Sequence, residues 1–449
     1  MREDIRIAVP EKGQYIVKTL QEAGFEAYVV GGCVRDSILG REPQDWDITT
    51  SARPQQVKAL FARTIDTGLQ HGTVTVMLQG EGFEVTTYRI DGTYEDSRHP
   101  SRVTFTADLR EDLRRRDLTI NAMAYNDTSG LADFFGGLAD LKAGVVRCVG
   151  DPGERFGEDA LRILRAIRFS AQLGYTIERD TAAAIVNLAP TLSRISAERI
   201  QTELVKLMVS PNPDFLRTAY DMGVTKVFLP EFDTAMETPQ NHPHHCYSVG
   251  EHILHSLKHV EADKALRLAM LFHDIGKPAV LTTDGEGRSH FHGHAAMGAE
   301  MARMILRRLK FDNDTILKVC KLVQYHDYGN GVDMDIGLAR RAVHRIGEDA
   351  FPAVFAVKRA DILAQSDYQR REKLARLDNW QKLYGEILAD RQCVSLRTLA
   401  VSGRDLIAAG WRPGREMGEV LNRLLELVLE DPARNTKEWL LAAAEEYRA

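Results

Sequence analysis

Cysteine is scarce in this sequence, and its few positions exclude two kinds of site. There are five cysteines, odd in number and without a CxxC pair, at Cys33, Cys148, Cys246, Cys320 and Cys393. A disulfide framework and a thiolate zinc site are therefore not expected. No stretch approaches the ~18 uncharged apolar residues of a membrane span, and the first residues lack the apolar core of a signal peptide. We expect a cytoplasmic protein with no membrane partner.

An excess of positive charge is also missing. The formal net charge is −6 and neither half of the chain is broadly basic, so an RNA partner would have to be held by local patches. With 449 residues the chain is too long for one core, and at roughly 150 residues per domain about three domains are expected. Histidine, in contrast, is concentrated: twelve of the fourteen lie between His242 and His344, which indicates a site.

The hydrophobic pattern changes along the chain. Up to about residue 145, strand-like runs such as AYVV, DWDIT, TVTVML and FEVTTY alternate with short helical segments, which predicts a small mixed sheet with flanking helices. Beyond it the pattern is almost entirely helical, and Gly and Pro are confined to breaks. A Pro/His-rich break near residues 238–245 is the best candidate for a domain boundary.

Two acids in the first part of the chain predict a metal site. Asp45 and Asp47 in QDWDIT lie on a predicted strand, where alternate side chains share a face. Paired carboxylates suit Mg²⁺, which in phosphoryl transfer binds triphosphate oxygens and activates an attacking hydroxyl. Glu84, on the predicted strand FEVTTY, is the candidate for a third carboxylate, and the alternative for it is a solvated residue on the strand face.

A glycine pair follows the first predicted strand. Gly31 and Gly32 lie at a strand-to-helix turn, where backbone amides and the helix N-terminus would bind phosphate, with Arg35 one turn inside the helix. The order of strand, Gly-Gly, helix with Arg-Asp and then Asp-x-Asp resembles the nucleotidyltransferase superfamily of DNA polymerase β. More closely, roughly residues 15–230 resemble the bacterial class II CCA-adding enzymes, which are tRNA nucleotidyltransferases, in the segments LGREPQDWDITTSARP, LQHGTVTVM, FEVTTYR, DLRRRDLTINAMAYN and ERFGEDALRILRAIRFSAQLGY.

The resemblance implies roles for several charged residues. It places Arg116 on the nucleotide, with Asp117 as support. It makes Asp159 and Arg162 the protein template that hydrogen-bonds the base edge of incoming CTP or ATP, and it assigns Arg165 and Arg168 to phosphate or ribose. The residue pattern itself predicts a continuous helix through GEDALRILRAIRF, on which each step of three residues turns by about −60°. Asp159 and Arg162 would then be neighbours, with Arg168 half a turn from Asp159; the alternative is a surface ladder of ion pairs.

A loop is predicted between the last strand and the RRRD segment. It has the sequence DGTYEDSRHPSRVTF and carries Arg98, His99 and Arg102, which are usually solvated in such a place. In the family that the chain resembles, a loop here helps to switch from C to A addition. Its presence therefore favours addition of A or of complete CCA.

The histidine-rich region has a pattern of its own. His252, His255 and His259 fall on one face of a predicted helix, and the adjacent His273 and Asp274 follow an apolar helix. An adjacent His and Asp at a helix end resembles the HD phosphohydrolase superfamily of helical, metal-dependent phosphatases and phosphodiesterases. By that resemblance the metal ligands are His252, His273, Asp274 and Asp361, with His294 and His326 able to hold a second metal. Imidazole plus carboxylate suits Mn²⁺, Fe²⁺, Co²⁺, Ni²⁺ or Zn²⁺, and a bound water would attack phosphorus. The alternative is an inactive helical domain that supports tRNA.

The sequence thus predicts an α/β nucleotidyltransferase head at residues 1–147, a helical neck and body at 148–240, an HD-type domain at 241–366 and a helical tail at 367–449. The predicted function is template-independent addition or repair of the 3′ CCA of tRNA from CTP and ATP, with release of pyrophosphate. Two alternatives remain open: an A-adding or poly(A) polymerase-type enzyme with the same site, and an HD phosphohydrolase whose head only binds RNA. The tail contains a basic cluster of Arg370, Arg371, Lys373 and Arg376. This cluster would either contact the tRNA acceptor arm or form a solvated helix face.

Overall fold

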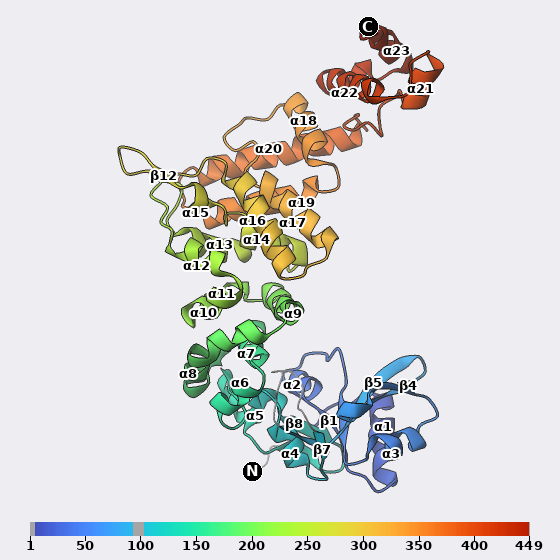
Figure 1. Cartoon of the computed structure of the whole chain (residues 1–449), viewed down its shortest axis with the longest axis vertical. Coiled ribbons are helices and arrows are strands. Elements are labelled where there is room, and N and C mark those ends of the chain that lie inside the picture. The colour runs from blue at the N-terminus through green and yellow to red at the C-terminus, as the bar shows by residue number, and fades with distance from the viewer. Residues whose placement is uncertain (1–4, 93–102, 449) are drawn as a thin grey trace. The chain divides into compact units, whose positions relative to one another are not determined.

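The chain forms two compact units, each with its own hydrophobic core (Figure 1). A computed structural model describes residues 5–92 and 103–448. The first unit spans Met1–Pro230 and the second Glu231–Ala449. The predicted loop residues Arg98, His99 and Arg102 lie outside the described part of the chain.

A seven-stranded sheet forms the centre of the first unit, in the order β3-β4-β5-β2-β1-β8-β9. Its strands are β1 (Ala27–Val30), β2 (Ile48–Thr50), β3 (Thr64–Gly68), β4 (Thr73–Leu78), β5 (Glu81–Thr87), β8 (Met123–Asn126) and β9 (Gly130–Asp133). β2 and β5 run parallel, and the other neighbouring strands run antiparallel. The prediction of a mixed sheet is therefore confirmed. A separate hairpin pairs β6 (Arg89–Asp91) with β7 (Val103–Phe105).

Short helices flank this sheet. They are α1 (Glu11–Glu22), α2 (Gly32–Ile38), α3 (Pro54–Leu60), α4 (Leu109–Arg114) and α5 (Gly137–Ala143). α1 is amphipathic and buries Ile16 and Leu20 completely, whereas α3 begins with Pro54 at a first-turn position, where the missing N–H costs no helix hydrogen bond. One boundary differs from the prediction: β2 begins at Ile48, so Asp45 and Asp47 precede the strand.

Helices make up almost all of the rest of the first unit. They are α6 (Pro152–Glu158), α7 (Leu161–Leu173), α8 (Arg179–Leu188), α9 (Ala197–Met208), α10 (Leu216–Asp221) and α11 (Thr225–Phe228). The prediction of a continuous helix through residues 157–169 is wrong. Asp159 has extended dihedral angles (φ −145°, ψ 103°), and its Oδ1 accepts the N–H of Leu161, so it ends α6 and caps α7. The angular relation between Asp159 and Arg162 that a single helix would impose therefore does not apply.

The second unit is helical apart from one short hairpin, β12 (Thr282–Thr283) with β13 (Ser289–His290). Its helices are α12 (Pro230–Glu237), α13 (Val249–Leu257), α14 (Lys264–Phe272), α15 (Lys277–Val280), α16 (His294–Arg308), α17 (Asn313–Tyr325), α18 (Ile336–Ile346), α19 (Phe351–Ala364), α20 (Arg370–Ala389), α21 (Gly403–Ala408), α22 (Arg415–Glu430) and α23 (Lys437–Glu445). α13, α14, α17 and α19 pack together around fully buried side chains such as Leu268 and Phe272. Over the described ranges, none of the helices combines the length and the apolar character that a membrane crossing needs.

Candidate functional site

Two carboxylates lie side by side at one end of the parallel pair β2 and β5, and a third lies two residues upstream of one of them. Ile48 of β2 is in register with Val85 of β5, so the residues just before them, Asp47 and Glu84, are neighbours across strands that lie about 4.8 Å apart. Asp45 is two residues upstream, and all three side chains are exposed. Oxygen donors of this kind can hold Mg²⁺. The structure thus places Asp47 beside Glu84, but the three acids do not form one of the compact groups of donor atoms found among the described residues. Their catalytic role stays a prediction.

The three acids act on one another electrostatically. Loss of hydration on burial raises the pKa of Asp47. The positive charge of Arg116 acts in the opposite direction, and the negative charge of Asp45 raises this pKa further. The pKa of Glu84 is raised by loss of hydration and by the charges of Asp47 and Asp45. Like charges held this close favour the protonated form, and a bound cation would reverse that preference. Burial and Asp47 also raise the pKa of the neighbouring Cys33 thiol to about 12, so this cysteine stays neutral.

Arg116 lies against the glycine turn. Gly31 has a φ of 82°, and a Cβ at this position would come within 2.9 Å of Nη1 of Arg116. Glycine is therefore required both for its backbone conformation and for the close approach of the guanidinium. Nη2 of Arg116 lies 3.7 Å from Oδ2 of the fully buried Asp112, and the Arg116 charge also reaches Asp47. A cation is thus fixed beside the carboxylates, on the side of the predicted phosphate turn.

Arg35, which the sequence places at a phosphate-binding turn, contacts other protein side chains in the structure. Its guanidinium donates to both carboxylate oxygens of Asp36, at 2.9 and 2.8 Å, and to Oδ1 of Asn121 at 2.6 Å. It also lies 4.8 Å from the ring centroid of Phe169. These contacts join α2 to the segment around Asn121. A role of Arg35 or of Gly32 in phosphate binding stays a prediction.

Asp117 anchors one arginine of α7. Its Oδ2 accepts Nε–H of Arg165 at 2.6 Å, and its Oδ1 accepts the N–H of Leu118 at 2.9 Å. Burial favours the neutral acid, but the charge and hydrogen bond of Arg165 lower the pKa of Asp117 below its usual range. Asp117, which directly follows Arg116 in the chain, is therefore a buried anion that orients Arg165.

Arg168 is held away from solvent. Its side chain belongs to a residue that is only 5% exposed, its Nε donates to Oε2 of Glu203 at 2.8 Å, and its guanidinium lies 3.6 Å from the ring centroid of Phe169. This ion pair fastens α7 to α9. A contact of Arg168 with phosphate or ribose stays a prediction, and the observed geometry gives it a packing role.

The two predicted base-reading residues are both engaged in ion pairs. Asp159 accepts from Nη2 and Nη1 of Arg199 at 2.6 and 3.3 Å, and Arg162 donates from Nη1 to Oε2 of Glu158 at 2.6 Å. The sequence reasoning missed Arg199 and Glu203, which hold Asp159 and Arg168 from α9. The signal was present in SAERIQTELVK, where an arginine and a glutamate four residues apart lie on one helix face.

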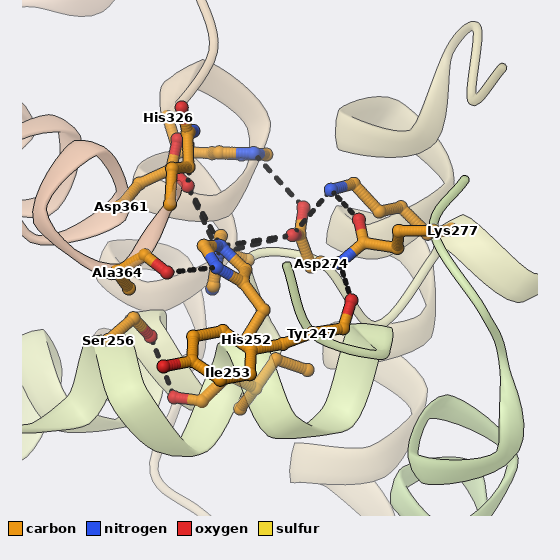
Figure 2. Close-up of polar contacts among 12 residues, drawn as sticks. Tyr247, His252, Ile253, Ser256, Asp274, Lys277, His326, Asp361 and Ala364 are labelled. Atoms are coloured by element: carbon orange, nitrogen blue, oxygen red, sulfur yellow. Dashed lines mark hydrogen bonds and ion pairs between the residues drawn. The ribbon is translucent and has the colours of Figure 1, made fainter. Parts of the chain in front are cut away.

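A second group of polar residues lies in the other unit, where four imidazoles and two carboxylates converge. Figure 2 shows His252, His326, Asp274 and Asp361 of this group. Each imidazole uses Nδ1 to donate to a backbone carbonyl: His252 to Ala364 at 3.3 Å, His273 to Met270 at 2.7 Å, His294 to Phe291 at 2.9 Å and His326 to Val323 at 2.7 Å. Because a carbonyl only accepts, Nδ1 carries the proton and Nε2 keeps its lone pair. The four Nε2 atoms are therefore available as ligands, in the arrangement typical of metal-binding histidines.

Asp274 lies between two ligand groups. Within the described ranges, the compact groups of donor atoms, all within 4.8 Å of one another, are His252–His273–Asp274 and Asp274–His294–His326. Oδ2 of Asp274 lies 3.3 Å from Nε2 of His273, and Oδ1 lies 3.5 Å from Nε2 of His294. Burial alone would raise the pKa of Asp274, but His273 and Lys277 lower it well below its usual value, so the residue is an anion. Each group could hold a divalent transition metal, and Asp274 belongs to both groups.

Asp361 completes this group. Its Oδ1 lies 2.9 Å from Nε2 of His252, and it accepts Nε2–H of Gln365 at 3.0 Å. Sequence reasoning missed two further residues of the group, Lys277 and Gln365. Nζ of Lys277 lies 2.7 Å from Oδ2 of Asp274, as Figure 2 shows, and it donates to Oε1 of Gln240 at 2.7 Å. The HDIGK spacing, with the lysine three residues after the aspartate, was its signal.

Glycines allow the backbone around Asp274 to pack tightly. Gly276 follows Asp274 by two residues, and a Cβ there would collide with the backbone nitrogen of Gly298 and the carbonyl oxygen of His294. The end of α14 can therefore lie directly against α16. This contact brings His273 and Asp274 to His294.

The basic residues of α20 mostly contact neighbours within the second unit. Arg370 pairs with Asp367 at 2.5 Å, Lys373 donates to Oε1 of Gln365 at 2.6 Å and Arg376 pairs with Asp333 at 2.9 Å. Arg371 is exposed. Contact of this cluster with the tRNA acceptor arm stays a prediction.

Three family models match the chain. A poly A polymerase head domain covers residues 27–147, a probable RNA and SrmB-binding site of polymerase A covers 174–236, and a tRNA nucleotidyltransferase domain 2 covers 289–444. The first of these contains the three carboxylates, the glycine pair and Arg116.

Known proteins resemble the chain over its whole length. A CCA-adding enzyme of Levilactobacillus brevis is 37% identical over 438 residues, which is 96% of this chain and 97% of the relative. A CCA-adding enzyme of Leuconostoc mesenteroides is 55% identical over 196 residues, 44% of this chain and 49% of that protein. The crystal structure of the Bacillus stearothermophilus CCA-adding enzyme in complex with CTP has a TM-score of 0.73 at 28% identity and covers 98% of this chain and 97% of its own. A Thermotoga maritima CCA-adding enzyme complexed with tRNA shares the fold, with a TM-score of 0.62, 21% identity and 100% and 97% coverage.

Proposed function

The chain belongs to the family of bacterial CCA-adding enzymes, tRNA nucleotidyltransferases with a poly A polymerase-type head, and from this premise we propose which residues perform the reaction. The enzyme adds or repairs the 3′-terminal CCA of tRNA from CTP and ATP. In each step O3′ of the tRNA forms a bond to the α-phosphorus, the bond from the α-phosphorus to the β-phosphate bridging oxygen breaks, and pyrophosphate leaves. The observation that supports the proposed site is the register of β2 and β5, which makes Asp47 and Glu84 neighbours.

Asp45 and Asp47, with Glu84, would hold the divalent metal that this family uses, generally Mg²⁺. The fit rests on three oxygen donors at one end of the pairing between β2 and β5, where loss of hydration and then the neighbouring negative charges raise the pKa values of Asp47 and Glu84. When bound, such an ion neutralises triphosphate charge and promotes deprotonation of the attacking hydroxyl. Arg116, fixed over Gly31, binds the triphosphate from the other side.

Base selection in this proposal belongs to Asp159 and Arg162. An acceptor carboxylate and a donor guanidinium can match the hydrogen-bonding edge of C or A, so the protein replaces a nucleic-acid template. Oδ2 of Asp159 keeps a second lone pair, so Asp159 can accept from the base while Arg199 holds it, whereas Arg162 must turn from Glu158 toward the base. Arg199 therefore acts as a positioning residue that holds Asp159 in place.

One assay tests the activity and its site together. tRNA transcripts that end before, within and after CCA are incubated with each single nucleoside triphosphate, with the wild type, Glu84→Gln and the matched control Glu81→Gln, which changes an exposed acid of the same strand. We expect the wild type to add C, C and A in turn, Glu84→Gln to lose most of the rate, and Glu81→Gln to keep it. Addition of A alone, or of a long A tail, would instead indicate the A-adding or poly(A) polymerase alternative. Equal rates in both variants would refute the role of Glu84.

For the second unit we propose an HD-type, metal-dependent phosphohydrolase activity at His252, His273, Asp274, His294, His326 and Asp361. The supporting observation is that the four imidazoles all commit Nδ1 to carbonyls and direct Nε2 to one region. A divalent transition metal held there would supply a water nucleophile for a phosphoester. Lys277, beside Asp274, would place a positive charge next to the phosphate.

Metal content and hydrolysis test this second activity. The full chain is loaded with Mn²⁺, Fe²⁺, Co²⁺, Ni²⁺ or Zn²⁺, dialysed and analysed for bound metal, and the hydrolysis of bis(4-nitrophenyl) phosphate and of a 2′,3′-cyclic nucleotide is measured. We expect His273→Ala to lose both metal and hydrolysis, and the control His259→Ala, which changes an exposed histidine outside both ligand groups, to lose neither. A chain that binds no transition metal would leave this unit as a support for tRNA.

A further inference from the structure

A second cavity adjoins the histidine group in the same unit. It has a volume of about 380 Å³ and lies between α19, α20 and the segment 329–334. A cavity of about 340 Å³ covers the histidine group. The two cavities share four lining residues, His244, His245, Asn330 and Gln365. A ligand of nucleotide size could therefore occupy the second cavity and extend to the ligand groups.

One wall of this cavity is apolar and carries a buried donor that finds no acceptor. Met334, Ile362, Leu377 and Trp380 line it, and Trp380 is 2% exposed. Among the residues that the structure describes, Nε1 of Trp380 has no hydrogen-bond partner. A buried N–H without an acceptor is costly, so an acceptor on a ligand that reaches Nε1 would stabilise the bound state. An apolar wall with one unsatisfied donor is typical of a site that orients a small ligand.

The charged lining of the cavity is entirely basic. Lys358, Lys373 and Arg376 line it, and none of the described lining residues is acidic. Nζ of the buried Lys358 donates to the carbonyls of His326 and Tyr328 at 3.1 and 2.9 Å and to Oδ1 of Asn330 at 2.6 Å. Its charge therefore contributes to the field of the cavity, while its hydrogens are already used. Lys373, which is half-buried, is the cation that can turn to an anionic ligand.

Lys373 is linked to the ligand groups through one side chain. Nζ of Lys373 donates to Oε1 of Gln365 at 2.6 Å, and Nε2 of Gln365 donates to Oδ1 of Asp361 at 3.0 Å. Gln365 belongs to both cavities, so the cavity and the Asp361 carboxylate share a hydrogen-bonded path. An anion bound at Lys373 would therefore be connected to Asp361 through the side chain of Gln365.

We propose that this cavity is a binding site for a nucleoside phosphate, with the base against Leu377, Met334 and Trp380 and the phosphate at Lys373. Apolar and aromatic side chains can pack against the face of any nucleobase, and the lysine ammonium attracts phosphate as a point charge. The use of this site in catalysis rests on the phosphohydrolase function proposed above, since the site would hold the part of the substrate that does not react. Binding itself requires only the cavity.

Photolabelling locates the ligand and separates this site from the head. The metal-free full chain is irradiated with 8-azidoadenosine 5′-monophosphate, and the labelled peptides are identified by mass spectrometry. We expect label in the segments 329–334 or 373–380. Label confined to residues 1–230 would overturn the proposal.

Variants give the strength of each contact. Lys373→Gln should reduce labelling of these segments about tenfold, and Trp380→Phe, which keeps an aromatic wall but removes the N–H, about threefold to tenfold. Arg371→Gln, an exposed cation on the same helix, and Trp439→Phe are the matched controls and should keep full labelling. Thermal unfolding of each variant shows whether it folds. If Lys373→Gln is folded and labelled like the wild type, the proposal is wrong.

The outcome is independent of the phosphohydrolase test. Hydrolysis of bis(4-nitrophenyl) phosphate without labelling of the cavity would remove this inference and leave the phosphohydrolase function. Labelling without metal binding or hydrolysis would support the nucleotide site and remove the phosphohydrolase function.

Discussion

Replacement of Arg199 should weaken the choice between CTP and UTP more than it slows the addition of C. In the free enzyme Arg199 holds Asp159 through a short contact of 2.6 Å and a longer one of 3.3 Å. The two side chains are only 22% and 13% exposed, so solvent screens the pair weakly. A hydrogen bond between charged groups contributes about 1.5 to 3 kcal/mol, and the short contact accounts for most of it. Arg199→Gln should therefore lower the CTP/UTP discrimination by about 10-fold and at most about 140-fold, since about 1.4 kcal/mol corresponds to a factor of ten.

The assay is single-nucleotide addition to a tRNA transcript that ends before CCA, with kcat/KM measured for CTP, UTP, ATP and GTP. Arg194→Gln, which changes an exposed arginine shortly before α9, is the control and should keep the wild-type ratio. Urea unfolding of both variants shows whether α9 still packs on α7. A folded Arg199→Gln variant with an unchanged CTP/UTP ratio would refute the positioning role. An equal loss of kcat/KM for all four nucleotides would also refute it, because that pattern indicates a general structural defect.

Four further outcomes follow from the geometry. Asp47→Asn should abolish incorporation of CTP and ATP without lowering the free energy of urea unfolding in metal-free buffer, because the raised pKa shows that the Asp47 charge is unfavourable there. Asp117→Asn should destabilise the chain at neutral pH. The pKa of Asp117 is lowered in the folded state, so its charge stabilises the fold fully above about pH 4, and this stabilisation is lost as the pH falls further. The urea midpoints of the variant and the wild type should therefore converge toward acid pH. Gly31→Ala should lower Tm and raise KM for both nucleotides, since φ at this position is 82° and the new Cβ meets Arg116. His294→Ala should halve the content of bound transition metal in metal analysis, because it removes a ligand of only one group.

The order of strands and helices in the head could be predicted from the sequence because it depends on local patterns. AYVV, TVTVML and FEVTTY have the alternation of strands, and all three are strands of the sheet. Among the candidate site residues, Asp47 lies beside Glu84, and the histidines lie in two compact groups that share Asp274. What a local pattern could not supply is the helix break at Asp159. The run GEDALRILRAIRF has the periodicity of one helix, and at the break Asp159 contacts Arg199, forty residues away in the chain.

Pairing between distant residues explains the other differences. Arg35 and Arg168 have the residue type of phosphate ligands, and nothing in their own segments indicates Asn121 or Glu203 as partners. Gln365 carries no motif at all, and its link between Lys373 and Asp361 exists only because α19 and α20 meet at their ends. Motifs identify the candidate reacting groups, whereas the residues that hold these groups in position can be identified only from the tertiary structure.

The parallel pairing of β2 and β5 has a consequence for how the head tolerates change in length. The chain between these strands forms α3, β3 and β4, which occupy one edge of the sheet. The turn from β4 to β5 passes through Gln79 and Gly80, both with positive φ, whereas Glu84 lies in the middle of β5, opposite Thr75 of β4. Residues inserted in this turn would lengthen the hairpin and leave Ile48 opposite Val85. A single residue inserted between Glu84 and Val85, in contrast, would turn Glu84 to the other face of the sheet and separate it from Asp47. Natural or engineered insertions should therefore be acceptable at the turn and harmful within β5.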